Sequence, residues 1–170
     1  PEQRARITRR PFGFKLRCAS FAPHSLVVRL HKNMNSYIRI TRIPYEEPYH
    51  INLILEVSNG SQQSVFEYYS SANSLIEIAD ELETFPQHKD SVFLHEIGSE
   101  REEDKWAYYF RFRVFTTNST GHCAIQFRFN NNEKLPEREI SEFCIKAESS
   151  QINRLGQLFR GFAKLQHEVL

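Results

Sequence analysis

Apolar and polar side chains alternate along the first half of the chain in short segments. Residues 37–43 and 51–57 place apolar side chains at every second position, a pattern typical of strands with one buried face. Asn59-Gly60 follows the second segment and indicates a hairpin, because both residues accept a positive φ at low cost. We therefore expect residues 65–69 to form the returning strand.

An amphipathic helix is predicted directly after this hairpin. Residues 70–74 hold three serines and an asparagine as candidate N-caps, and Pro86 marks the end of the helix. Between them, apolar side chains recur at helical spacing, at Leu75, Ile78, Ala79, Leu82 and Phe85. This stripe predicts a helix that packs on the apolar face of a sheet.

The second half of the chain repeats the plan. A short strand at 92–94, a long aromatic strand at 106–117 and a turn at 118–121 precede alternating strands at 123–129 and 143–147. Serines then cap a final helix whose apolar stripe consists of Ile152, Leu155, Phe159, Phe162 and Leu165. Both halves pass from a strand through serines into a helix, so an internal duplication is a hypothesis. The predicted fold class is α+β, an antiparallel sheet of hairpins with two amphipathic helices covering its apolar face.

Charge is distributed unevenly along the 170 residues. Residues 1–33 contain eight basic residues and one acidic residue, whereas residues 34–170 contain 14 basic and 20 acidic residues. The only methionine, Met34, falls at this boundary. We expect residues 1–33 to be a basic N-terminal extension, non-native or translated from upstream, and residues 34–170 to form a single α+β domain. The alternatives are a targeting peptide, a nucleic-acid-binding arm, or a structured N-terminus with a strand at 25–30.

The sequence lacks the common motifs of catalysis and metal binding. Cys18, Cys123 and Cys144 have no ligand spacing, and their odd number argues against a disulfide framework. No His-Glu-x-x-His motif, phosphate-binding glycine loop or Gly-x-Ser-x-Gly elbow occurs. No apolar run reaches the length of a membrane span. We therefore predict no enzyme activity, no catalytic residue, no cofactor, no metal, no membrane partner and a cytoplasmic location.

One polar cluster follows from the register of the predicted aromatic hairpin. A four-residue turn pairs Thr117 with His122, and this register places five polar residues on one face of the sheet, namely Tyr109, Arg111, Arg113, Gln126 and Arg128. Arg111 falls opposite Arg128, and since like charges repel, we expect a carboxylate such as Glu142 beside them. The face is either a solvated surface with ordinary ion pairs or a ligand-binding patch for a carboxylate, a phosphate or an acidic loop.

Three segments of the chain resemble a family of small bacterial proteins. Residues 37–50 (YIRITRIPYEEPYH) are similar to the opening segment of WapI-type immunity proteins, and residues 121–127 (GHCAIQF) are similar to a late strand of that family. The predicted helix at 152–165 also fits, so the resemblance spans about residues 34–170. It implies a cytoplasmic protein that binds and neutralises a toxin domain without catalysis, and it identifies no binding residues.

The charge of the main domain agrees with a protein partner. A net charge of −6 over residues 34–170 favours association with a basic toxin domain and disfavours nucleic acid. Two alternative functions remain open. One is a small-ligand-binding protein or enzyme that uses the arginine-rich face, Arg111, Arg113 and Arg128, and the other is a structural domain that self-associates.

Overall fold

The strands form two antiparallel sheets, and each sheet is followed by a helix. The computed structural model describes residues 28–29, 36–44, 47–104, 107–118, 120–166 and 169–170. The first sheet has the order β1-β2-β3-β4 and is followed by α1, with the bounds β1 (Val28–Arg29), β2 (Ser36–Ile43), β3 (Ile51–Asn59), β4 (Gln63–Ser70) and α1 (Ala72–Glu83). The second sheet has the order β5-β6-β7-β8 and is followed by α2, with the bounds β5 (Val92–Gly98), β6 (Tyr109–Thr116), β7 (His122–Asn130), β8 (Ile140–Glu148) and α2 (Ser149–Phe162). A short 3₁₀ turn, η1 (Glu102–Asp104), lies between β5 and β6.

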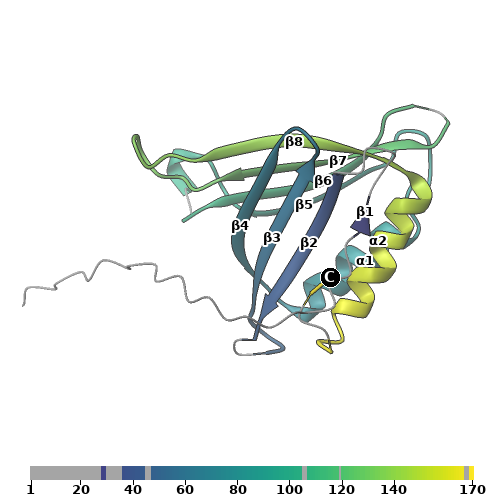
Figure 1. Ribbon diagram of the computed structural model, residues 1–170, viewed down its shortest axis with the longest axis horizontal. Helices are drawn as coiled ribbons and strands as arrows, with labels where there is room; N and C mark the ends of the chain where they lie inside the picture. Colours follow the sequence, from purple (N-terminus) through teal and green to yellow (C-terminus); the bar gives the residue numbers. More distant parts are fainter. Residues whose placement is uncertain (1–27, 30–35, 45–46, 105–106, 119, 167–168) are drawn as a thin grey trace, which may run out of the picture.

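The two sheets and the two helices enclose one apolar core. In Figure 1 the strands of the first sheet run steeply across those of the second, and α1 and α2 lie side by side. β2 and β3 bury every second residue over most of their length, as expected for strands with one face turned inward. Aromatic rings join the two sheets, since the centroids of Phe66 on β4 and Phe110 on β6 lie 4.8 Å apart.

The predicted α+β class is confirmed, with antiparallel hairpins and one amphipathic helix in each half. The strands divide between two sheets, and the order of four strands and a helix occurs twice. Alternation along a strand identifies its buried face but not the strand beside it. The sequence therefore predicts the strands themselves more readily than their division into two sheets.

The helices α1 and α2 pack closely at Gly156. A Cβ atom at this position would lie 2.7 Å from the backbone nitrogen of Glu83, so a larger residue requires movement of one helix. One turn earlier on α2, Asn153 Nδ2 donates hydrogen bonds to the carbonyl oxygens of Leu82 (3.0 Å) and Phe85 (2.6 Å). These bonds attach α2 to the C-terminal end of α1 and to the segment that follows it.

Both described ends of the chain cover the same edge of β2. β1 pairs with the beginning of β2, and the backbone of Leu170 exchanges hydrogen bonds of 3.3 and 2.8 Å with that of Ile40. β1 falls within the strand at 25–30 that one alternative predicted. The rest of the predicted basic extension, residues 1–27 and 30–33, lies outside the described residues.

Candidate interaction surface

The hairpin of β6 and β7 has the predicted register. The Thr117 nitrogen donates a 2.8 Å hydrogen bond to the His122 carbonyl, and Arg111 pairs with Arg128 in the ladder. The second sheet therefore turns one set of side chains away from the core, here called the outer face. Its members are Val92, Leu94 and Glu96 on β5, Tyr109, Arg111, Arg113 and Phe115 on β6, Ala124, Gln126 and Arg128 on β7, and Glu142, Cys144 and Lys146 on β8.

All five residues of the predicted patch lie together on the outer face, which the hairpin register explains. Tyr109, Arg111 and Arg113 come from β6, and Gln126 and Arg128 come from β7. Their role in binding a ligand stays a prediction.

Arg111 is held by a carboxylate from the neighbouring strand. Its Nε lies 2.9 Å from Glu96 Oε1, and the Tyr109 hydroxyl donates a hydrogen bond to the same oxygen. The hydrogen bond from Tyr109, with a smaller contribution from that of Arg111, holds the pKa of Glu96 below its usual value. Burial together with Glu96 raises the pKa of Tyr109 to about 12, so Tyr109 stays a neutral donor at physiological pH.

Arg128 is held on two sides. Its Nε and Nη2 lie 3.0 and 2.9 Å from the two carboxylate oxygens of Glu100, and Nη1 binds Glu142 on β8. Asn130 Nδ2 also donates to Glu100 at 2.7 Å. Burial alone would raise the pKa of Glu100, but the hydrogen bonds from Arg128 and Asn130 outweigh it and lower that pKa.

The prediction of Glu142 as a carboxylate beside the two arginines is confirmed, whereas Glu96 and Glu100 were missed. Glu96 follows the segment predicted as a strand, and β5 in fact continues to Gly98. The alternation of Phe93, His95 and Ile97 with Leu94 and Glu96 was the signal that would have placed Glu96 on the outer face. Glu100 lies in a loop, and no periodicity indicates its position.

The other end of the outer face is less polar. Within the described residues Arg113 makes no ion pair, and its guanidinium lies 4.8 Å from the centroid of the Phe115 ring. On the neighbouring strand, Val92 and Leu94 are 55% and 51% exposed. The outer face thus combines an ion-paired half with an apolar half that carries a cation stacked on an aromatic ring.

A polar hollow of about 720 Å³ adjoins the ion-paired half. It lies between the β5–β6 and β7–β8 connections, and its lining includes Glu100, Arg128, Asn130, Lys134 and Arg138. Arg128 and Glu100 are already bound to each other on its wall. Lys134 and Arg138 supply its remaining positive charge.

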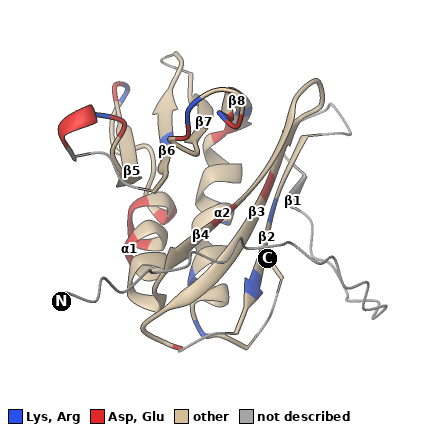
Figure 2. Ribbon diagram, turned by 90° about the vertical axis from the view of Figure 1, so that its left-hand side faces the viewer, with Lys and Arg blue, Asp and Glu red and all other residues tan. Residues whose placement is uncertain are grey.

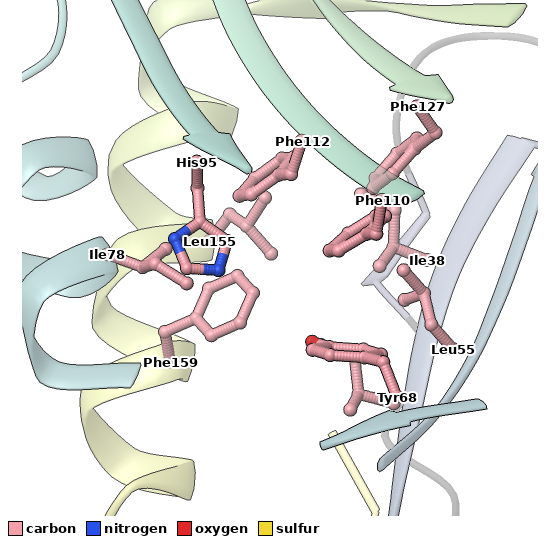
Figure 3. A pocket seen from close by; sticks show the side chains of 11 residues that line it. Ile38, Leu55, Tyr68, Ile78, His95, Phe110, Phe112, Phe127, Leu155 and Phe159 are labelled. Carbon is pink, nitrogen blue, oxygen red and sulfur yellow. The ribbon is translucent and has the colours of Figure 1, made fainter. Parts of the chain in front are cut away.

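A second, apolar cavity lies inside the core (Figure 3). The His95 ring and the Tyr68 hydroxyl point into it, among apolar side chains from both sheets and both helices. Its volume of about 10 Å³ is the scale of a single water molecule. Burial raises the pKa of Tyr68 and lowers that of His95, so both side chains are neutral at physiological pH. This cavity has no room for a substrate.

The described part of the chain has neither a metal-binding cluster nor a membrane-spanning helix. It contains no group of three or more histidine, cysteine, aspartate or glutamate residues arranged to hold a metal ion. Cys123 is buried and Cys144 is exposed, and both are free thiols, whereas Cys18 lies outside the described residues. None of the described helices is long and apolar enough to cross a membrane.

Comparisons with known proteins give little further information. No family model matches the chain, and no curated protein matches it. Among solved structures, one of the plant transcriptional regulator PBF-2 is similar to this chain, with 8% sequence identity and a TM-score of 0.43. The alignment covers 75% of this chain and 73% of the PBF-2 chain. A likeness at this level carries no argument about function.

Proposed function

We propose that this chain is a non-catalytic protein-binding domain, and that it acts as a cytoplasmic immunity protein that neutralises a bacterial toxin domain. The observation that supports this proposal is the composition of the outer face. Side chains from four adjacent strands form one continuous surface that combines exposed aliphatic groups, an aromatic ring and arginines. Protein interfaces are enriched in aromatic residues and arginine and carry a polar rim around an apolar centre.

The ion pairs of the outer face suit recognition of a partner. Glu96 holds Arg111, and Glu100 and Glu142 hold Arg128, so these side chains are ordered before a partner arrives. Ordering in the free protein lowers the entropy cost of binding. Arg113 differs, since it makes no ion pair within the described residues and is available to a partner's carbonyl or carboxylate groups.

Long-range charge favours a basic partner. Residues 34–170 carry a net charge of −6, although the whole chain has a net charge of +1. α1 contains no lysine or arginine and four carboxylates, of which Asp80 and Glu83 are paired with Arg160 of α2, whereas Glu77 and Glu81 are exposed. Opposite charges accelerate association, and salt weakens this effect. A toxin domain with a basic surface is the partner that this distribution fits.

The test begins with a search beside this gene for one that encodes a large secreted protein with a variable C-terminal toxin domain. That domain is co-expressed with this chain, and the two purified proteins are then titrated calorimetrically. We expect restored growth and a complex whose association rate falls as salt rises. Arg113→Ala should weaken binding roughly tenfold, as for an interface anchor. Arg154→Ala, the same change at an exposed position on α2, is the matched control and should change affinity less than about twofold.

Failure of the wild-type protein to bind the toxin domain would contradict the proposal. A second candidate function is binding of a small polar ligand in the polar hollow, whose lining has three basic residues, Arg128, Lys134 and Arg138, and three acidic ones, Glu100, Glu102 and Glu133. Binding of phosphate or a dicarboxylate there, in place of a toxin domain, would support that candidate. A concentration-dependent dimer that forms through the outer face would instead support self-association.

A further inference from the structure

Each edge of the first sheet carries a contact from another part of the chain, which on β4 is one hydrogen bond near the end of the strand. β1 and the backbone of Leu170 together pair with the outer side of β2. On the opposite edge, the Tyr69 nitrogen of β4 donates a 3.2 Å hydrogen bond to the Tyr108 hydroxyl. Such contacts occupy backbone groups that an additional strand would need.

The second sheet has one edge with a covering contact and one without. On β8, the Cys144 carbonyl accepts a 3.3 Å hydrogen bond from Asn59 Nδ2, at the tip of the β3–β4 hairpin. β5 forms the other edge and pairs with β6 over all seven of its residues. In the described ranges, no further strand pairs with β5. Its sequence, VFLHEIG, has neither proline nor lysine, the residues that commonly protect an edge strand.

The side chains along β5 indicate the chemistry of an added strand. Val92 and Leu94 present exposed apolar groups on the outer face, followed by Glu96. On the other face, His95 lies within electrostatic range of Glu77 on α1. Figure 2 shows acidic residues of α1 and of η1 on the same side of the molecule as β5. A strand beside β5 therefore meets exposed apolar side chains on the outer face and the α1 carboxylate Glu77 on the other face.

Charge decides between two occupants of this edge. A second copy of the chain, paired β5 to β5, would bring the exposed Glu77 and Glu81 carboxylates of two α1 helices towards each other, which like charges disfavour. A strand of alternating apolar and basic residues meets complementary groups on both faces. We infer that β5 is a docking edge that accepts an extended basic segment of the partner protein by strand addition; this inference rests on the proposed protein-binding function.

The probe is a synthetic seven-residue peptide of alternating lysine and valine, added to the full chain. We expect it to slow amide hydrogen exchange at residues 92–98 at least fivefold and to leave residues 63–70 of β4 unchanged. Two control peptides separate the contributions of charge and backbone. One replaces each lysine with glutamate, and the other keeps every side chain but carries N-methyl groups on alternate residues, which removes the hydrogen bonds of one edge. Neither control should protect β5.

Two matched protein variants locate the contact. Val92 on β5 and Val65 on β4 are 55% and 56% exposed, so Val92→Lys and Val65→Lys make the same change at equally exposed positions of edge strands. Val92→Lys places a charged side chain against the valines of the peptide and should lower its affinity at least tenfold. Val65→Lys should lower it less than twofold. Circular dichroism confirms that both variants are folded.

The inference is overturned if the lysine–valine peptide does not protect β5, if the N-methylated peptide protects it equally, or if both variants bind alike. A dimer that Val92→Lys dissociates would assign the edge to a second copy and would also overturn it.

The toxin complex separates this inference from the proposed function. If Val92→Lys binds the toxin as tightly as the wild type does, and the amides of β5 still exchange freely in the complex, the docking edge is rejected and the immunity role is retained. Absence of toxin binding, with peptide still docked on β5, rejects the immunity role alone.

Discussion

Arg111 and Arg128 lie directly opposite each other on β6 and β7, and their carboxylate partners approach from opposite sides. Glu96 on β5 binds Arg111, while Glu142 on β8 binds Arg128. Partly exposed pairs of this kind contribute about 0–1 kcal/mol each. Their main consequence is therefore the fixed geometry of the outer face, which leaves the adjacent Arg113 as its most adaptable charge.

A single side chain, His95, also makes the free energy of unfolding depend on pH. Its Nε2 is buried and has no hydrogen-bond partner among the described residues, and burial lowers its pKa below 6.5, with Glu77 partly opposing this. The unfolded chain then binds a proton more readily than the folded chain does. The contribution of His95 to stability is therefore complete above pH 6.5 and is lost as the pH falls towards the lower pKa of the folded state.

The variant His95→Leu removes this titration and keeps an apolar side chain in the cavity. Between about pH 7 and about pH 5, the thermal midpoint of the wild-type protein should fall further than that of the variant. Differential scanning calorimetry of both proteins in the same buffers measures the difference. Parallel decreases would show that other groups determine the pH dependence.

Among the elements, the crossing of α1 and α2 depends on a missing side chain. Gly156→Ala should destabilise the fold by about 1–3 kcal/mol, because the added Cβ meets backbone atoms of α1. Alanine would otherwise favour the helix by about 1 kcal/mol. Gly161, also on α2, has no atom within 4 Å of an added Cβ, so Gly161→Ala should be neutral or stabilising. Urea denaturation of the two variants tests this contrast, and equal effects would contradict close packing at Gly156.

The elements also show why sequence reasoning succeeded in some places and failed in others. The β6–β7 hairpin was predicted in register because turn length and alternation agree there, and with it the five polar residues of the outer face. Glu96 was missed because the strand was ended at Leu94, although a charged residue on a solvent face is compatible with a strand. Glu100 reaches Arg128 from a loop, a contact that depends on tertiary structure and leaves no local pattern.

For the whole molecule, the two halves of the chain are connected at several places, and three of them join the main elements. Phe66 meets Phe110 between the sheets, α1 packs on α2 at Gly156, and the C-terminal Leu170 returns from the second half to pair with β2 of the first. The core residues of both halves form one continuous cluster. We therefore expect the two halves to unfold in a single transition.

Leu170 provides the most direct test of this connection. Its side chain is only 4% exposed, and its backbone is bound to Ile40. Leu170→Ala should therefore cost about 2–5 kcal/mol, as other buried leucine truncations do. Leu135→Ala is the same substitution at a side chain that is 81% exposed, and it should cost less than about 0.5 kcal/mol. Chemical denaturation measures both values, and far- and near-ultraviolet circular dichroism should report the same midpoint for each protein. If Leu170→Ala costs no more than Leu135→Ala, the C-terminus does not join the two halves, and the first sheet is held by its other contacts alone.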